Sequence, residues 1–133
     1  MTRVLVIDDE PDVRWMLRLS LEREGYEVLL AEDGLRGVAM AQRQKPDAIV
    51  LDLMMPVMDG YDVLQILARD ARTSHIPVVV LTAKAIPDEE EKVTELGARR
   101  FLTKPFDPMD LAAELHEILE ADRGPAPGSE PAT

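Results

Sequence analysis

The sequence has no cysteine and no long run of apolar residues. Without cysteine among its 133 residues, the chain can form neither a disulfide nor a thiolate metal site. No stretch approaches the roughly 18 apolar residues of a membrane span, and the apolar run at residues 4–7 is too short for a secretory signal. These absences favour a cytoplasmic protein that does not enter a membrane.

An excess of positive charge is also missing. The chain carries 15 Lys and Arg against 26 Asp and Glu, a formal net charge of −11 at pH 7. Because nucleic-acid phosphates are contacted by clustered Lys and Arg, direct nucleic-acid binding is not expected. The hydrophobic fraction of 46% is ordinary for a globular protein, and the length suits one domain. Most of the acids are expected to keep the chain soluble, and position must identify those that do chemistry.

Short apolar runs alternate with longer amphipathic segments along the chain. The runs predict strands at residues 4–7, 26–31, 48–51, 78–81 and 101–103. The segments that follow them predict helices at residues 11–24, 35–44, 61–69, 88–96 and 107–121. This alternation implies right-handed crossovers and a parallel sheet covered by helices on both faces. Residues 122–133 are rich in Pro, Gly and polar residues and are expected to form a disordered tail or linker.

The acids at the start of the fourth expected helix have a local explanation. Asp88 and Glu91 have the spacing of a capping box, and Gly97 suits the end of the helix. Residues 88–91 are all acidic and would lie at the positive end of the helix dipole. This run of charge therefore needs no binding role.

Polar residues stand where four of the expected strands end. Asp8 and Asp9 follow the first strand, Asp52 the third, Thr82 the fourth and Lys104 the fifth. Because the carboxyl ends of parallel strands share one edge of the sheet, we expect these side chains to gather there. Asp52 has apolar neighbours on both sides in the sequence, so any partners it has must come from the other strands.

Three carboxylates beside one lysine suggest a bound cation. Two unit charges about 4 Å apart interact by roughly 4 kcal/mol at an effective dielectric of 20. Such repulsion implies that a carboxylate takes a proton or that a divalent cation binds. Oxygen ligands favour a hard ion, and few protein ligands with room for water favour Mg²⁺ over Ca²⁺. A carboxylate beside Mg²⁺, a lysine and a hydroxyl suits phosphoryl transfer to Asp52, with Lys104 and Thr82 contacting the phosphoryl oxygens.

Four motifs carry a family resemblance. They are VLVIDDE, LDLMMPVMDG, VVVLTA and FLTKPF, and they occur in this order, each at the end of an expected strand. Together they resemble the receiver domain of bacterial two-component response regulators. The resemblance implies a flavodoxin-like, doubly wound (βα)5 sandwich whose parallel strands have the order 2-1-3-4-5. It assigns residues 1–121 to the receiver domain and 122–133 to the tail.

The resemblance assigns the acceptor and the metal ligands. Asp52 would receive a phosphoryl group from a histidine kinase or a phosphotransfer protein. Asp9, Asp52 and the backbone carbonyl of Met54 would ligate Mg²⁺, and Asp8 would act mostly through water. The chain would then be a signalling protein and not an enzyme that turns over an external substrate.

The resemblance also implies a conformational switch. Thr82 and Lys104 would contact the phosphoryl group. Phe101 would turn inward as Thr82 moves toward the phosphoryl group. The Lys104–Pro105 peptide bond would be cis. Met54 and Lys84 would flank the route of attacking water, and an apolar Met54 predicts slow self-dephosphorylation.

Other residues can be interpreted either as structural or surface residues or as functional ones. Trp15 lies off the apolar stripe of the first expected helix and is expected to be partly exposed. That helix docks kinases in related proteins, so Trp15 could serve docking together with Val13 and Met16. His75 and His116 are expected to be structural or solvated.

Two other functional classes remain as alternatives. A phosphatase of the haloacid-dehalogenase type carries a second acid two residues after its nucleophile, where this chain has Met54. A flavodoxin-like cofactor carrier needs a phosphate-binding loop after the first strand, where Asp8, Asp9 and Glu10 would repel phosphate.

The resemblance leaves the output and the oligomeric state open. A single-domain protein would dock on an unknown partner through its fourth helix, fifth strand and fifth helix, whereas a fragment would have lost an effector after the tail. Receivers attached to winged-helix domains often carry an acid before the switch aromatic, where Arg99 and Arg100 stand here. That difference puts their mode of dimerisation in doubt without excluding dimers.

Overall fold

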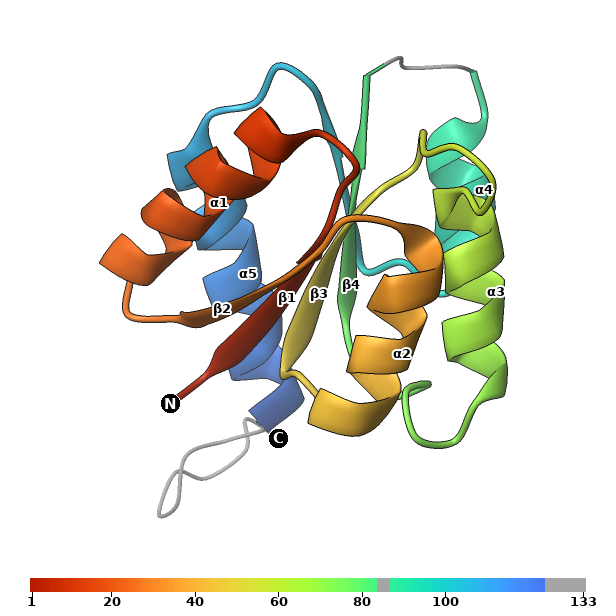
Figure 1. Ribbon diagram of the computed structural model, residues 1–133, viewed down its shortest axis with the longest axis horizontal. Helices are drawn as coiled ribbons and strands as arrows, with labels where there is room; N and C mark the ends of the chain where they lie inside the picture. The colour runs from red at the N-terminus through yellow and green to blue at the C-terminus, as the bar shows by residue number, and fades with distance from the viewer. Residues whose placement is uncertain (84–86, 124–133) are drawn as a thin grey trace, which may run out of the picture.

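A parallel sheet of five strands forms the centre of the computed structural model, which describes residues 1–83 and 87–123. The strands are β1 (Arg3–Ile7), β2 (Glu27–Ala31), β3 (Ala48–Asp52), β4 (Val78–Thr82) and β5 (Arg100–Thr103). Their order is β2-β1-β3-β4-β5, and every neighbouring pair is parallel. Figure 1 shows β2, β1, β3 and β4 side by side in this order. The predicted flavodoxin-like fold and strand order are therefore confirmed.

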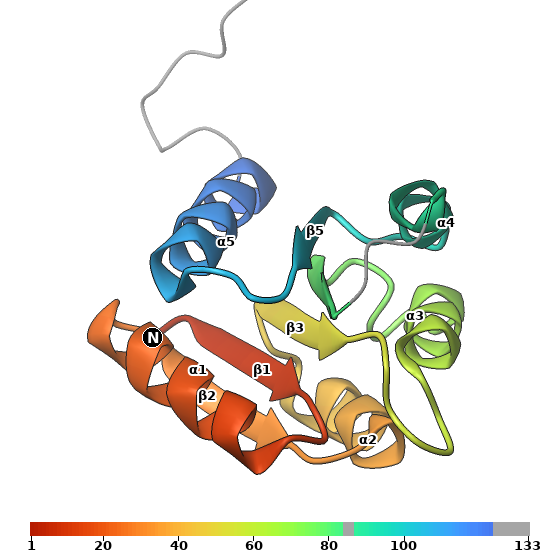
Figure 2. The same cartoon turned by 90° about the horizontal axis from the view of Figure 1, so that it is seen from above.

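Helices cover both faces of the sheet (Figure 2). They are α1 (Pro11–Arg23), α2 (Gly34–Gln44), α3 (Gly60–Arg69), α4 (Glu89–Glu95) and α5 (Pro108–Arg123). The helices α2, α3 and α4 lie on one face, and α1 and α5 lie on the other. Within the described residues, none of these helices is long and apolar enough to cross a bilayer.

Alternate residues of the central strands pack into two separate hydrophobic cores, one on each face of the sheet. In β1, Leu5 and Ile7 pack under α2, α3 and α4, whereas Val4 and Val6 pack under α1 and α5. This alternation follows from the two-residue period of a strand. Both β3 and β4 are buried along their whole length, which explains why their sequences are continuously apolar up to their last residues.

Two helix ends differ from the expected ones. Asp88 has a left-handed backbone, with φ at 68°, and its carboxylate makes no capping hydrogen bond within the described parts of the chain. The expected capping box at Asp88 is therefore wrong, and one occurs instead at the start of α3, between Asp59 and Asp62. Helix α5 continues to Arg123, two residues into the expected tail. Residues 124–133 and Lys84 lie outside the described residues.

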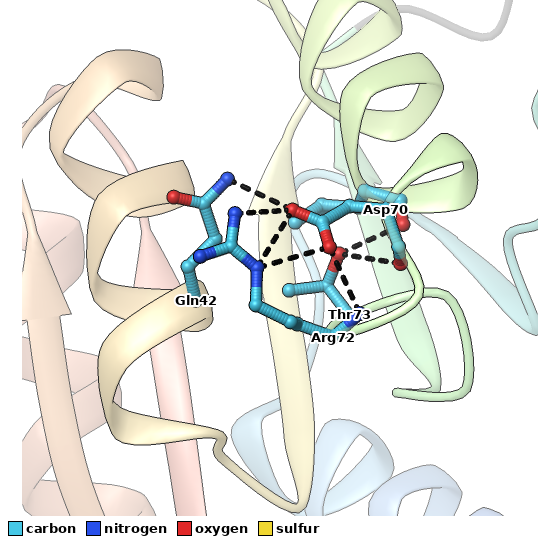
Figure 3. A network of polar contacts seen from close by, with 5 residues as sticks. Gln42, Asp70, Arg72 and Thr73 are labelled. Atoms are coloured by element: carbon cyan, nitrogen blue, oxygen red, sulfur yellow. Dashed lines mark hydrogen bonds and ion pairs between the residues drawn. The ribbon is translucent and has the colours of Figure 1, made fainter.

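The turn after α3 ties that helix to α2 (Figure 3). The Asp70 carboxylate accepts hydrogen bonds from the Arg72 guanidinium, at 2.8 Å from Nη2, and from Gln42 Nε2 of α2 at 3.1 Å. The Arg72 bonds hold the pKa of Asp70 at about 2. The buried Thr73 hydroxyl donates to the Leu67 carbonyl at 2.8 Å. These contacts satisfy polar groups at the end of α3, far from the edge where β3 and β4 end.

Candidate functional site

The carboxyl ends of the strands deliver the predicted polar residues to one edge of the sheet. Asp52 is the last residue of β3 and Thr82 the last of β4, and these two strands are neighbours. Asp8 follows the last residue of β1. Asp8, Asp52 and Thr82 are all buried, with exposures of 0%, 2% and 1%. Asp52 has its charged partner, Lys104, after another strand, as predicted, but its carboxylate also accepts a hydrogen bond from the nearby Met54 N–H, so the expectation that every partner comes from another strand is wrong.

Lys104 lies beside three carboxylates, two from the connection after β1 and one from the end of β3. Its Nζ atom lies 3.1 Å from Asp8 Oδ2, 3.7 Å from Asp52 Oδ2 and 3.7 Å from Glu10 Oε1. The backbone N–H of Lys104 donates to the Thr82 carbonyl at 2.6 Å, which fixes the lysine beside the end of β4. The Lys104–Pro105 bond is cis, as the family resemblance implied.

Four acids lie close enough to hold one metal ion. Asp8, Asp9, Glu10 and Asp52 each offer a carboxylate oxygen, and these oxygens lie within 4.8 Å of one another. A donor set made of carboxylate oxygens suits a hard divalent cation such as Mg²⁺. Glu10 is a member of the group that the sequence analysis did not propose as a ligand. Its place directly after the two aspartates was the signal that could have identified it.

The charges at the site are incompletely balanced. Burial and the neighbouring Asp8 raise the pKa of Asp52 to about 6, against the attraction of Lys104 and the hydrogen bond from the Met54 N–H. Burial also raises the pKa of Asp8. Burial lowers the pKa of Lys104, but its attraction to Asp8 and Asp52 outweighs that effect and leaves the pKa raised. A divalent cation would relieve the remaining repulsion between the carboxylates.

Backbone contacts around Asp52 and Asp8 fix the two acids. The Met54 N–H donates to Asp52 Oδ1 at 3.2 Å, and the Arg14 guanidinium donates to the Asp8 carbonyl at 2.7 Å. The Gly60 N–H donates to the Leu53 carbonyl at 2.9 Å, so the start of α3 lies directly against the end of β3. The site is therefore built on strand ends and on one tight connection, which gives it a rigid frame.

The remaining candidates lie elsewhere. Phe101 lies on β5 opposite Val80 and packs partly buried against the core under α2, α3 and α4. Trp15 is 58% exposed, which confirms the expected exposure. His75 and His116 are both exposed, and His75 precedes β4 at the edge of the sheet opposite Asp52. Neither histidine belongs to the group of side chains in the described residues that could hold a metal ion.

The fold and the strand-end site together define a class of protein. A parallel five-stranded α/β sandwich with acids, a hydroxyl and a lysine at one edge is what the receiver resemblance implied. The family model described as the response regulator receiver domain matches residues 4–116. The chain belongs to this family, and receiver domains are signalling modules of two-component systems.

Individual relatives match over most of the chain. Protein PilH of Pseudomonas aeruginosa is 40% identical over 121 residues, which cover 90% of this chain and 98% of that protein. The DNA-binding dual master transcriptional regulator RpaA of Synechocystis sp. is 43% identical over 126 residues, which cover 94% of this chain and 52% of that protein. The chain thus spans about half the length of RpaA.

A solved structure agrees with the fold. The chemotaxis protein CheY4 of Vibrio cholerae superposes with a TM-score of 0.84 at 33% identity. The match covers 89% of this chain and 98% of that one. This similarity extends over nearly all of the sheet and its helices.

Proposed function

We propose that the chain accepts a phosphoryl group on Asp52 and signals through the conformational change that follows. The observation that carries this proposal is the position of Lys104 Nζ, 3.1 Å from Asp8 and 3.7 Å from Asp52 at the end of β3. A cation placed between two buried carboxylates is ready to contact a phosphoryl oxygen once one arrives on Asp52. Thr82 is the last residue of the adjacent strand β4, and its hydroxyl is the proposed second contact of the phosphoryl group.

The transfer itself needs one nucleophile. An oxygen of the Asp52 carboxylate attacks the phosphorus of a phosphohistidine on a histidine kinase or a phosphotransfer protein. The new P–O bond forms as the P–N bond breaks, and the released imidazole keeps the electron pair of that bond. Lys104 stabilises the negative charge on the phosphoryl oxygens, and Thr82 donates a hydrogen bond to one of them.

The acids at the site are proposed to hold Mg²⁺. Asp9 and Asp52 are the proposed direct ligands with the Met54 carbonyl, and Asp8 acts mostly through water. When bound, the ion neutralises charge on the transferring phosphoryl group. The all-oxygen donor set and the raised pKa of Asp52, at about 6, support this assignment.

The proposed response begins at Thr82 and reaches Phe101. Thr82 moves toward the phosphoryl group, and Phe101 turns further into the core that it already borders. The proposed upstream partner is a histidine kinase or a phosphotransfer protein, and the downstream partner is an output domain or protein. The name of RpaA describes DNA binding by that longer protein, of which this chain spans about half, and DNA binding is not proposed for this chain.

Mass spectrometry with acetyl phosphate and Mg²⁺ tests the acceptor. The wild-type protein should gain the mass of one phosphoryl group, and Asp52→Ala should gain none. Asp88→Asn is a suitable control because Asp88 is exposed and does not belong to the group of acids that could hold a metal ion. The proposal would be contradicted if Asp52→Ala gained a phosphoryl group. It would also be contradicted if neither the wild type nor Asp88→Asn gained one although both were folded.

The phosphoryl group is expected to survive well beyond a few seconds without a phosphatase. The Met54 side chain is 59% exposed beside the acceptor and has no group that could orient an attacking water. Met54→Gln should shorten the lifetime because its amide can hold that water, while the backbone N–H that contacts Asp52 remains. The decay of the phosphorylated mass over time measures both. Loss of the group from the wild type within seconds would sink this expectation.

A further inference from the structure

Glu89 is a buried acid outside the phosphoacceptor site. It is the first residue of α4 and is 2% exposed. Its Oε2 atom accepts a hydrogen bond from the Tyr61 hydroxyl of α3 at 2.8 Å. Its Oε1 atom is buried and has no hydrogen-bond partner among the described residues. The helix dipole, which accounts for the acidic run at residues 88–91, does not explain why Glu89 is buried.

This arrangement is costly. A buried carboxylate loses its hydration, and one hydrogen bond replaces only part of what water provided. Burial and the bond to Glu89 raise the pKa of Tyr61 to about 12, so the hydroxyl stays protonated and remains a donor at neutral pH. The contact therefore has a defined geometry, yet the carboxylate would gain hydration if α4 moved outward.

The rest of α4 supplies few other anchors. The helix is seven residues long, and Val93 is the other residue within it that is buried. The residue before it, Asp88, has a left-handed backbone and provides no side-chain cap within the described residues. A helix this short depends on tertiary contacts for its stability. The bond to Tyr61 is thus a large part of what fixes its first turn.

The bond also joins two connections that begin at the phosphoacceptor edge. Tyr61 directly follows Gly60, whose N–H donates to the carbonyl of Leu53, the residue after Asp52. Glu89 follows the connection that leaves β4 after Thr82. A change at either strand end therefore has a short covalent route to one partner of the bond. Figure 2 shows α3 and α4 as neighbours on this face of the sheet.

We propose that the hydrogen bond between Tyr61 and Glu89 is a latch that holds the start of α4 against α3 in the unphosphorylated protein. It opens when Asp52 carries a phosphoryl group, and the surface of α4 is then released for a partner. The opening step rests on the function proposed above. Closure of the latch is a property of the unphosphorylated protein and can be measured separately.

Amide hydrogen exchange of the unphosphorylated full chain tests the closed latch. Tyr61→Phe removes the donor and keeps the ring, so Glu89 Oε2 loses its partner and Oε1 remains without one among the described residues. Exchange in peptides that cover α4 should accelerate at least about tenfold, because a hydrogen bond to a charged group is among the stronger ones and its loss leaves the carboxylate without a donor. Tyr26→Phe is the matched control, because Tyr26 packs against the core on the opposite face of the sheet. It should leave exchange in α4 unchanged.

Glu89→Met should differ from Tyr61→Phe although it also removes the bond. Methionine fills a similar volume without a charge to desolvate, so its apolar contacts should replace the bond, and exchange in α4 should be no faster than in the wild type. Unchanged exchange in α4 of Tyr61→Phe would overturn the latch. Equally faster amide exchange in all helices would overturn it as well, because the loss of one local bond should loosen α4 and leave α1 and α5 unchanged.

Phosphorylation with acetyl phosphate and Mg²⁺ tests the opening. Exchange in α4 of the wild type should rise toward that of Tyr61→Phe, whereas Glu89→Met should show a much smaller rise at equal occupancy of Asp52. Mass spectrometry of the intact protein gives that occupancy. A fully phosphorylated wild type with unchanged α4 exchange would refute the opening alone. If the wild type takes no phosphoryl group, the proposed function and the opening both fail, while the comparison without phosphate still decides the closed latch.

Discussion

Exchange of Asp52 for asparagine is expected to raise the free energy of unfolding of the metal-free protein at neutral pH. Asp52 is 2% exposed, and its ionised form lies among other acids. Its pKa is about 6 in the folded protein, raised from 3.8. Asparagine keeps the shape and an oxygen that can accept from the Met54 N–H, but it carries no charge. The expected gain is on the order of 1–3 kcal/mol, from the free-energy equivalent of a pKa shift.

The pH dependence should change in the same variant. Because the pKa of Asp52 is higher in the folded than in the unfolded state, the folded protein binds more protons between pH 3.8 and about 6. The contribution of Asp52 to stability is therefore present below pH 3.8 and is lost as the pH rises through about 6. Asp52→Asn should lack this loss. Urea unfolding across the window, with Asp88→Asn as the control acid, measures the difference.

Magnesium should make the wild type more stable than Asp52→Asn, the reverse of their order without metal. A cation that binds the folded state stabilises it by mass action, and the wild type has the full set of acids to bind it. Asp52→Asn lacks one proposed ligand, so its midpoint of unfolding should respond weakly to Mg²⁺. A variant that is less stable than the wild type without metal would contradict the repulsion argument. Equal stabilisation of both proteins by Mg²⁺ would contradict the role of Asp52 as a ligand.

The site could be predicted from the sequence because its residues stand at the ends of strands. A continuous apolar run predicts a buried strand, and parallel strands place their carboxyl ends at one edge. Asp8, Asp52 and Lys104 could therefore be grouped although they are far apart in the chain. Glu10 belongs to the same group and was not predicted, although it directly follows Asp8 and Asp9, because the sequence does not show which way a side chain in the connection after β1 lies.

The features around α4 were not accessible in this way. The spacing of Asp88 and Glu91 satisfies a capping box, but spacing does not determine a backbone angle, and Asp88 adopts a left-handed conformation. The burial of Glu89 depends on how α4 packs beside Tyr61, which a short acidic segment does not encode locally. Polar contacts between helices can be predicted only when the tertiary structure is known, whereas the strand ends can be predicted from the apolar pattern of the sequence.

Replacement of Gly60 by alanine is expected to destabilise the protein and to disturb the acceptor loop. A Cβ atom at Gly60 would lie 2.6 Å from Leu53 Cα and 2.8 Å from the Asp52 carbonyl oxygen. Both are backbone atoms and cannot rotate away as the end of a side chain could. The start of α3 would have to move off β3, which should cost about 2–3 kcal/mol, as is typical of overpacking. Chemical denaturation of the two proteins measures this loss.

The same displacement should weaken the response to magnesium and acetyl phosphate. The Gly60 N–H that now reaches the Leu53 carbonyl would be pulled away, and Leu53 connects Asp52 to the Met54 N–H that contacts its carboxylate. Asp52 should therefore lose part of its fixed orientation, with a smaller shift of the unfolding midpoint by Mg²⁺ and slower phosphorylation. Thermal unfolding with and without Mg²⁺, together with the rate of mass gain, gives both quantities.

Gly37→Ala separates general instability from damage to the site. A Cβ atom at Gly37 would lie 2.5 Å from the end of the Ile7 side chain, under α2 and away from the connection between Asp52 and α3. This variant should also lose stability, yet its remaining folded population should keep the wild-type response to Mg²⁺. If Gly60→Ala and Gly37→Ala lost that response equally, the close approach of Gly60 to β3 would have no special role in holding Asp52. A loss confined to Gly60→Ala would show that the absence of one side chain lets the acceptor loop close over the strand end.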